Sequence, residues 1–342
     1  MGMAERIVLT QVNLADGFGA TQWRTLLLMR ALAGRPVVQQ LVVKKGGVLE
    51  EVAQQWGFTV LSVRPYAWPG SKSAIDGDLA HAHGRASWRW TAAGKRPYIA
   101  GMDGHRVESI RLPGSGVVAV APTRSLVEQI HACMPQLPVE RIPPLYDDRI
   151  VPQGEEQSNL AIQLRGRFVF GLCCSYAPES GIEDALEAMR WLTTRNHKAH
   201  LLVVGFNGLT GALRARARSL GAVTLLEKQT DPAAWFGLFN AYLSPARKAM
   251  DDNGLVQAMY AGLPIIATWL TAMDDFVQQG QSAILMPSLD PPALGKAMFD
   301  LMKDDSLTFR LGATARRHVE KFSPQVVGER AFRLYQTICS QP

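Results

Sequence analysis

The amino-acid sequence predicts an α/β protein built from two doubly wound domains that face each other across a cleft. Short apolar runs of strand length alternate with longer segments of helical period along the 342 residues, and this alternation is typical of parallel sheets covered by helices. The length accommodates two domains of about 170 residues, each large enough for its own core. With 47% hydrophobic and 19% charged residues, the composition is that of a globular protein.

The first half alternates between apolar runs and helical segments from its start. Its opening strand leads into a loop with two glycines at residues 16–20, after which the pattern becomes helical. We expect strands over residues 6–12, 37–43, 59–63, 79–81, 98–100 and 117–121, and helices over residues 23–32, 48–56 and 123–133.

The pattern breaks around residues 142–148, and a second series begins at residue 168. Residues 150–164 are polar and irregular, as expected of an interdomain linker. The predicted domains therefore cover residues 1–155 and 165–322. In the second domain we expect strands over residues 168–174, 200–204, 223–226, 241–243 and 264–268, and helices over residues 182–193, 209–220, 233–239 and 254–261.

Charge is distributed unevenly between the two halves. The net charge is +6, and residues 1–150 carry 17 Lys and Arg against 12 Asp and Glu, whereas the remainder carries 19 against 18. A basic first domain favours an anionic partner such as membrane headgroups or a charged glycan; a basic surface without such a partner is the plain alternative. We predict no nucleic-acid binding, because the basic residues are not interleaved with aromatic residues in a compact stripe.

Localisation signals and metal motifs are not evident in the sequence. No apolar run reaches the roughly 18 residues of a membrane-spanning helix, and the start of the chain lacks the apolar core of a secretory signal. Cys133, Cys173, Cys174 and Cys339 show no metal-ligand spacing, so we expect reduced thiols in the cytoplasm. Neither a metal nor a cofactor is predicted.

In doubly wound folds ligands bind beyond the carboxyl ends of the strands, and a glycine loop lies at the first such position. Gly17 and Gly19 allow the backbone to approach a ligand and leave amides free for an anion. The loop is not a dinucleotide fingerprint, because the third glycine is missing, and an ordinary tight turn explains it equally well.

Two further candidate loops lie in the second half. Ser180, with Glu183 three residues later, predicts a capping box that opens a helix; this is an ordinary cap or a helix N-terminus that faces an anion. Asp252 or Asn253 is expected to cap a short helix whose free amides suit a phosphate. Gly262 ends that helix before the next strand.

Residues 81–85 and 102–106 form a fourth candidate, because histidine, aspartate and arginine cluster at strand ends. Each histidine here is interpreted either as a catalytic group or as a packed, hydrogen-bonded one. We expect His81 and His83 to point to opposite faces of their strand, which argues against a two-histidine metal site.

Residues 245–268 read Pro-Ala-Arg-Lys-Ala-Met-Asp-Asp-Asn-Gly-Leu-Val-Gln-Ala-Met-Tyr-Ala-Gly-Leu-Pro-Ile-Ile-Ala-Thr. Without a gap, this stretch resembles the pattern P-S-x-x-E-G-x-x-N-x-x-x-E-A-M-A-x-G-x-P-V-V-A-T of the family-4 retaining glycosyltransferases, also called glycosyltransferase group 1. Residues 78–84, 201–205 and 280–291 resemble further segments of that family. The resemblance implies the GT-B architecture of two Rossmann-like domains, with a terminal helix over residues 323–342 that crosses back toward the first domain.

The charged donor contacts of the family pattern are absent. Its paired glutamates fall on Ala249 and Gln257, and its donor-binding Arg and Lys fall on Ser175 and Ser180. The resemblance implies a divergent donor site. The candidates to replace the missing cations are Arg247 and Lys248 or the helix N-termini at Ser180 and Asn253, and Gln257 is expected to bond a ribose hydroxyl. The predicted donor-binding residues are Gly17, Gly19, Ser175, Ser180, Gly205, Arg247, Lys248, Asn253, Gly254, Leu255 and Gln257.

The catalytic histidine of the family's N-terminal loop falls nearest Asp103, with His105 two residues later, and these two are the predicted catalytic residues. The implied function is metal-independent transfer of a hexosyl-type sugar from a nucleotide-sugar donor to a glycan or lipid-linked cell-envelope acceptor, with retention. The protein is then cytoplasmic, with peripheral membrane contact through its basic first domain. The alternative is a catalytically silent scaffold or a glycan-binding protein.

Overall fold

The computed structural model describes residues 6–64, 77–92, 97–102, 112–114, 116–149, 154–248 and 253–340. The chain divides into two compact units. The first comprises Met1–Leu145 together with Phe322–Pro342, and the second comprises Tyr146–Lys321.

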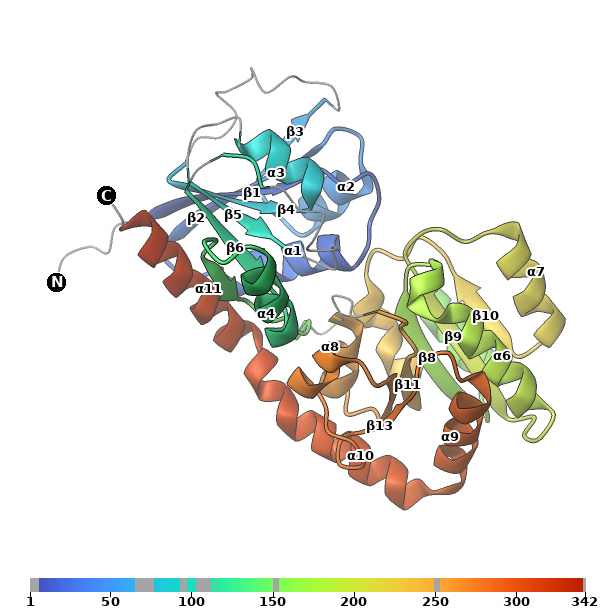
Figure 1. The fold of residues 1–342 in the computed structure, drawn as a ribbon. Helices are drawn as coiled ribbons and strands as arrows, with labels where there is room; N and C mark the ends of the chain where they lie inside the picture. Colours follow the sequence, from blue (N-terminus) through green and yellow to red (C-terminus); the bar gives the residue numbers. More distant parts are fainter. Residues whose placement is uncertain are drawn as a thin grey trace. The chain divides into compact units, whose positions relative to one another are not determined.

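The first unit is built on a seven-stranded parallel sheet with the strand order β3-β2-β1-β4-β5-β6-β7 (Figure 1). The order reverses between β1 and β4, which places a topological switch point at their carboxyl ends. The strands are β1 (Ile7–Asn13), β2 (Val37–Lys44), β3 (Val60–Val63), β4 (Leu79–His83), β5 (Tyr98–Gly101), β6 (Val117–Ala121) and β7 (Val139–Arg141).

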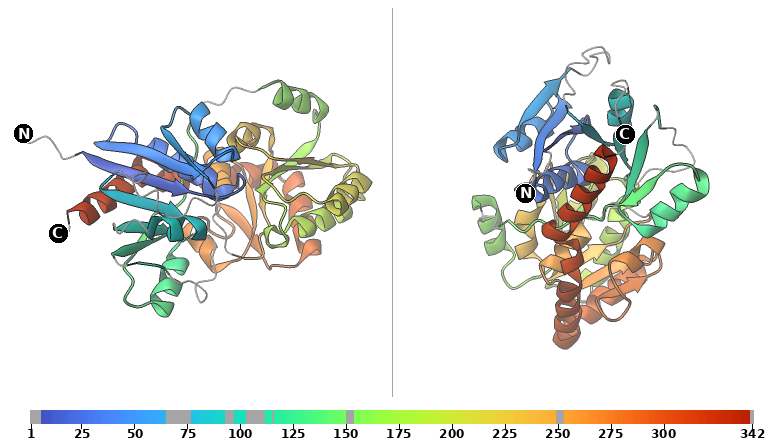
Figure 2. Two further views of the ribbon diagram at one scale, coloured as in Figure 1. Left: turned by 90° about the horizontal axis from the view of Figure 1, so that it is seen from above. Right: turned by 90° about the vertical axis from the view of Figure 1, so that its left-hand side faces the viewer.

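Helices cover both faces of this sheet. One face packs its aliphatic side chains against α3 (Arg85–Ala92) and α4 (Arg124–Cys133), and α2 (Val48–Gln55) contacts β2 and β3. The helices α1 (Ala20–Ala31) and α11 (Pro324–Cys339) lie side by side against β1 (Figures 1 and 2). A Cβ atom at Gly328 of α11 would lie 2.4 Å from the carbonyl oxygen of Ala31. Glycine is therefore needed for these two helices to approach so closely.

The second unit repeats this design with a six-stranded parallel sheet in the order β10-β9-β8-β11-β12-β13. Most residues of its central strands are buried, as expected of a sheet covered on both faces. Helices α6, α7 and α9 pack on one face of this sheet (Figure 1), while α8 and the short helix η4 contact strand β8. The strands are β8 (Phe168–Cys174), β9 (Ala199–Gly205), β10 (Val223–Leu226), β11 (Ala241–Ser244), β12 (Ile265–Thr268) and β13 (Ala283–Met286). The helices are α5 (Glu155–Gln163), α6 (Ile182–Thr193), α7 (Gly211–Leu220), η4 (Pro232–Leu238), α8 (Asn253–Tyr260), α9 (Pro291–Lys303) and α10 (Asp305–His318).

The predicted strands and most of the predicted helices are confirmed, and two expectations are wrong. The expected irregular linker contains helix α5, which the sequence pattern does not reveal because Leu160 is its only buried side chain. Residues 232–238 form a 3₁₀ segment, η4, in place of an α-helix. Among the described residues, no helix is long and apolar enough to cross a membrane.

Candidate functional site

The loops that follow β8, β9 and β11 of the second unit lie beside one another, because these strands are parallel neighbours. Cys174, the last residue of β8, pairs in register with Gly205, the last residue of β9. The loops that carry Ser175, Asn207 and Arg247 therefore emerge at the same edge of the sheet. Most of the predicted donor-binding residues belong to this edge.

A close backbone contact joins the loop after β11 to the start of α6. Gly181 has φ +73°, and a Cβ atom there would lie 1.9 Å from the carbonyl oxygen of Pro245. The amide of Arg247 also donates to the carbonyl of Glu179 at 2.9 Å. Only glycine satisfies both the left-handed conformation and the contact, so Gly181 sets where residues 245–248 lie.

Arg247 is held by Asp184 in the first turn of α6. Its Nε and Nη2 atoms donate to the two carboxylate oxygens of Asp184 at 2.9 and 2.8 Å, the fork geometry of a strong charge-assisted pair. The hydrogen bond from Arg247 to Asp184 raises the pKa of the Arg247 guanidinium. The Arg247 side chain keeps 30% of its surface exposed, so the guanidinium is both paired and accessible.

Lys248 makes a weaker contact, because its Nζ lies 3.5 Å from Oε1 of Glu179 and its side chain is 57% exposed. Both cations that the sequence offers as replacements are thus paired with carboxylates. No local sequence signal identifies these partners, since Asp184 is 63 residues from Arg247.

Ser180 is buried and uses its hydroxyl inside the loop. Its Oγ donates to the carbonyl of Ala177 at 2.7 Å and accepts from the amide of Ile182 at 3.3 Å. The capping box predicted for Ser180 and Glu183 is wrong, because Gly181 occupies the N-cap position of α6 and leaves no side-chain cap. Ser175, half-buried, directly follows β8.

Tyr176 shapes the same edge and is absent from the residues that the sequence predicts. A Cβ atom at Gly205 would lie 2.0 Å from its ring, and its Oη donates to the carbonyl of Leu226 at 2.5 Å. Burial raises the pKa of this phenol. Gly205 therefore admits the Tyr176 ring, and the ring ties together the ends of β8, β9 and β10.

Helix α8 begins at Asn253, and its first three residues, Asn253, Gly254 and Leu255, are buried. A Cβ atom at Gly254 would lie 2.3 Å from Oη of Tyr242 and 3.3 Å from Cβ of Cys173. The absence of a side chain at Gly254 lets the helix start directly over β8 and β11. A helix N-terminus in this position presents backbone amides to anions.

Gln257, on the same helix, contacts the start of the second unit. Both ends of its amide bond the backbone of Asp147. Ala249 and Asp252 lie outside the described residues.

The two predicted glycines of the first unit lie between β1 and α1. Gly19 is the N-cap residue of α1 with an extended backbone, and its carbonyl accepts from the amide of Trp23 at 2.9 Å. Gly17 is half-buried in the preceding loop. Asn13, at the end of β1, holds both sides of this loop, because its Oδ1 accepts from the Ala15 amide and from Nε2 of Gln22. The predicted catalytic residues Asp103 and His105 lie outside the described residues.

The expectation for the histidines of β4 is wrong. The rings of His81 and His83 stack with their centroids 4.3 Å apart, because residues two positions apart in a strand point to the same face. Nδ1 of His81 lies 2.9 Å from Oη of Tyr335 on α11, and Nε2 of His83 donates to Oε1 of Gln11 at 2.8 Å. Within the described ranges no group of three or more His, Cys, Asp or Glu residues could hold a metal ion.

These histidines predict acid sensitivity of the first unit. Burial, together with the nearby Arg24 guanidinium, lowers the pKa of His83 to about 3, and burial and His83 lower the pKa of His81 well below its usual value. Both are therefore neutral in the folded protein, whereas the unfolded chain takes up protons below about pH 6.5. The free energy of unfolding should fall as pH drops below about 6.5, by at most about 1.4 kcal/mol per pH unit for each histidine.

Urea unfolding between about pH 7.5 and 4.5, a range that spans the ordinary histidine pKa, measures this slope. His83→Gln removes one titrating group while keeping a hydrogen-bonding side chain. Its free energy of unfolding should therefore depend less steeply on pH, as expected when about one fewer proton is taken up on unfolding. The matched control is His131→Gln on the exposed surface of α4. Equal slopes for wild type and His83→Gln would contradict the assignment.

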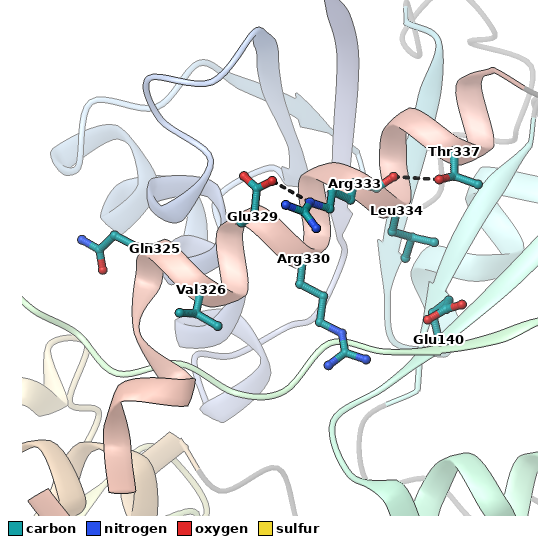
Figure 3. Close-up of a pocket in the computed structure, with 8 residues that line it drawn as sticks. All are labelled: Glu140, Gln325, Val326, Glu329, Arg330, Arg333, Leu334 and Thr337. Carbon is teal, nitrogen blue, oxygen red and sulfur yellow. Dashed lines mark hydrogen bonds and ion pairs between the residues drawn. The ribbon is translucent and has the colours of Figure 1, made fainter. Parts of the chain in front are cut away.

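A groove of about 730 Å³ lies on the first unit between β7 and the outer face of α11 (Figure 3). Arg330, Arg333, Glu140 and Glu329 contribute its charged side chains, and Nε of Arg333 donates to Glu329 at 2.7 Å. Its charges are balanced, so the excess positive charge of the first half lies elsewhere than in this groove.

Residues 167–304, which contain all of the second-unit loops described above, match the family Glycosyl transferases group 1. The predicted resemblance to glycosyltransferase group 1 is thereby confirmed for that part of the chain, while the retaining, family-4 subtype stays a prediction.

Curated relatives include the capsular polysaccharide biosynthesis glycosyltransferase CapM of Staphylococcus aureus, 24% identical over 183 residues, which are 52% of this chain and 48% of CapM. The D-inositol 3-phosphate glycosyltransferase of Corynebacterium jeikeium is 26% identical over 313 residues, 78% of this chain and 74% of the relative. The chain thus spans about half the length of CapM and about three quarters of the second relative.

Among solved structures, Anabaena HepE in complex with UDP and glucose superimposes with a TM-score of 0.82 and 15% identity, covering 97% of this chain and 100% of HepE. At this identity the likeness concerns the fold. The predicted GT-B fold of two parallel-sheet, Rossmann-like units is confirmed.

Proposed function

We propose that the protein is a glycosyltransferase that binds a nucleotide-sugar donor at the loops following β8, β9 and β11. The observation that carries this proposal is the start of α8, where the bare backbone of Gly254 lies over Tyr242 and Cys173. The backbone amides at the N-terminus of a helix suit the phosphates of a donor. The match of residues 167–304 to Glycosyl transferases group 1 supports the same conclusion.

The charge at this site favours an unusual donor. A nucleotide diphosphate carries about two to three negative charges that a transferase must stabilise as the leaving group departs. Here Arg247 is an accessible cation beside the start of α6, and Asp184 already neutralises part of its charge. A donor with a single phosphate, or an unusual sugar nucleotide, needs less cationic stabilisation and fits this site better.

The remaining parts of the proposal concern the first unit and the acceptor. By analogy with the family, the reaction retains the anomeric configuration, uses no metal, and depends on Asp103 and His105 as catalytic residues. The relatives named for capsular polysaccharide and for inositol 3-phosphate favour a glycan or lipid-linked cell-envelope acceptor. The positive charge of residues 1–150 favours peripheral contact with anionic lipids, at the cytoplasmic face where nucleotide sugars are available.

The test is a panel of UDP-, GDP-, ADP-, dTDP- and CMP-sugars, measured by thermal shift and by release of nucleotide. At least one donor should raise the unfolding temperature in a concentration-dependent manner and should be hydrolysed or transferred. Asp103→Ala should keep the thermal shift and lose turnover. A variant that chiefly unfolds at lower temperature would instead assign Asp103 a structural role.

A catalytically silent scaffold or glycan-binding protein is the second candidate, and the missing family charges at Ser175, Ser180 and Gln257 favour it. If the protein is such a scaffold, a glycan should raise its unfolding temperature and no nucleotide sugar should do so. Donor-dependent stabilisation without turnover, in the presence of a range of acceptors, would identify a scaffold that retains its nucleotide site.

A further inference from the structure

Both ends of the Gln257 side-chain amide form hydrogen bonds with the backbone of a single residue, Asp147. Its Oε1 accepts from the amide of Asp147 at 2.7 Å, and its Nε2 donates to the carbonyl of Asp147 at 3.2 Å. The residue is 4% exposed. Two residues 110 positions apart are thus joined by a two-point contact that requires one donor and one acceptor on the same side chain.

The segment around Asp147 is anchored to the same helix by its aromatic neighbour. The ring of Tyr146 stacks on that of Tyr260, with centroids 4.1 Å apart and planes 12° from parallel. The guanidinium of Arg316 lies 4.0 Å from the centre of the Tyr260 ring. Residues 146 and 147 therefore contact α8 both in its middle and at its end.

An ion-pair network holds the other side of this segment. The carboxylate of Asp147 is fully buried and accepts from Nε of Arg149 at 2.9 Å, and Nη2 of Arg149 reaches Oδ1 of Asp231 at 2.9 Å. Burial raises the pKa of Asp231, against the opposing effect of Arg149. The start of the second unit is thus tied to α8 on one side and to the residue before η4 on the other.

We propose that Gln257 is a positioning residue, which acts through the backbone of Asp147 to hold α8 with its N-terminus in place for the donor phosphates. The donor part of this inference rests on the function proposed above. It differs from the expectation that Gln257 bonds a ribose hydroxyl, because it assigns one acceptor position and one donor position of the amide to the backbone of Asp147. The N-terminal residues Asn253 and Gly254 lie one turn away on the same short helix.

The chemistry of the contact explains why an amide is suited to this position. A carboxylate accepts from the Asp147 amide but cannot donate to its carbonyl, and it adds a negative charge beside the buried Asp147 carboxylate. A protonated carboxyl group again has one donor and one acceptor. The variant Gln257→Glu should therefore behave like wild type only at low pH, where the introduced carboxyl group is neutral.

The experiment compares Gln257→Glu and Gln257→Leu with wild type by calorimetric titration with UDP, GDP and CMP as probes. The titrations are run at about pH 8.0 and about pH 5.5, on either side of the pKa expected for a buried carboxyl group. At the higher pH both variants should bind the nucleotide that wild type binds about tenfold more weakly, which corresponds to the loss of one or two hydrogen bonds. At the lower pH Gln257→Glu should return to within about twofold of wild type at that pH, whereas Gln257→Leu should not. The matched control, Gln281→Glu, adds the same charge at an exposed position of the same unit and should have no effect.

Tighter binding by Gln257→Glu at the higher pH would overturn the proposal, because a direct ribose contact predicts that gain. Wild-type affinity in Gln257→Leu would overturn it as well. Hydrogen exchange provides a readout without ligand: Gln257→Leu should increase exchange at the Asp147 amide and across α8, with α6 and α9 unchanged. If wild type binds no nucleotide while this exchange pattern holds, the proposed function fails and the anchoring of α8 stands.

Discussion

Gly181→Ala is expected to lower the free energy of unfolding of the second unit by about 2 to 5 kcal/mol. The left-handed backbone conformation at φ +73° disfavours any residue with a Cβ by about 1 to 2 kcal/mol. The added methyl would also lie 1.9 Å from the Pro245 carbonyl, and relieving such a clash costs about 1 to 3 kcal/mol more. Chemical denaturation followed by tryptophan fluorescence and circular dichroism measures the loss.

Gly221→Ala is the matched control for this prediction. Gly221 has φ +66° at the end of α7, and nothing lies within 4 Å of a Cβ built there. Gly221→Ala therefore tests the backbone conformation alone, and its free energy of unfolding should fall by only about 1 to 2 kcal/mol. Gly181→Ala should in addition move residues 245–248 and weaken nucleotide binding, which Gly221→Ala should not. Equal losses in the two variants would mean that the Gly181–Pro245 contact relaxes without cost.

Arg247→Ala should have the largest effect among substitutions at the donor loops, with transfer slowed about 10²- to 10³-fold, the typical consequence of removing one stabilising contact from developing negative charge. Arg247 is the partly exposed guanidinium beside the α6 N-terminus, held in a defined orientation by Asp184. Affinity for the nucleoside diphosphate should fall with it. Titration calorimetry and steady-state kinetics with the donor found in the panel check both effects.

Asp184→Asn separates an anion-binding role from a structural one. It removes the competing carboxylate, so Arg247 should bind the nucleotide more tightly at low ionic strength, and salt should reduce the gain. Lys248→Ala is the control and should have a smaller effect, because Lys248 is more exposed and only weakly paired with Glu179. Two results would assign the Arg247–Asp184 pair a purely structural role in joining the loop after β11 to α6. One is unchanged nucleotide affinity in Arg247→Ala, and the other is a loss of nucleotide affinity in Asp184→Asn as large as that in Arg247→Ala.

Much of the fold follows from local sequence patterns. The apolar run at residues 117–121 predicts a strand with the observed bounds, because a short, valine-rich run bounded by Gly116 and Pro122 is typical of a buried strand. The stretch 245–268 points to α8 and β12 in the same way. Helix α5 escapes such a prediction because it buries little apolar surface, so its pattern resembles that of a polar linker.

The amino-acid sequence alone predicts two parallel α/β units, the family resemblance of the second, and the glycines where a close backbone approach to a ligand is expected. The partners of the polar side chains become visible only in the folded protein. It paired Arg247 with Asp184, Gln257 with the Asp147 backbone, and His81 with His83 and Tyr335. This difference arises because apolar periodicity is a local property of the chain, whereas the partner of a buried polar group is set by packing between segments far apart in sequence.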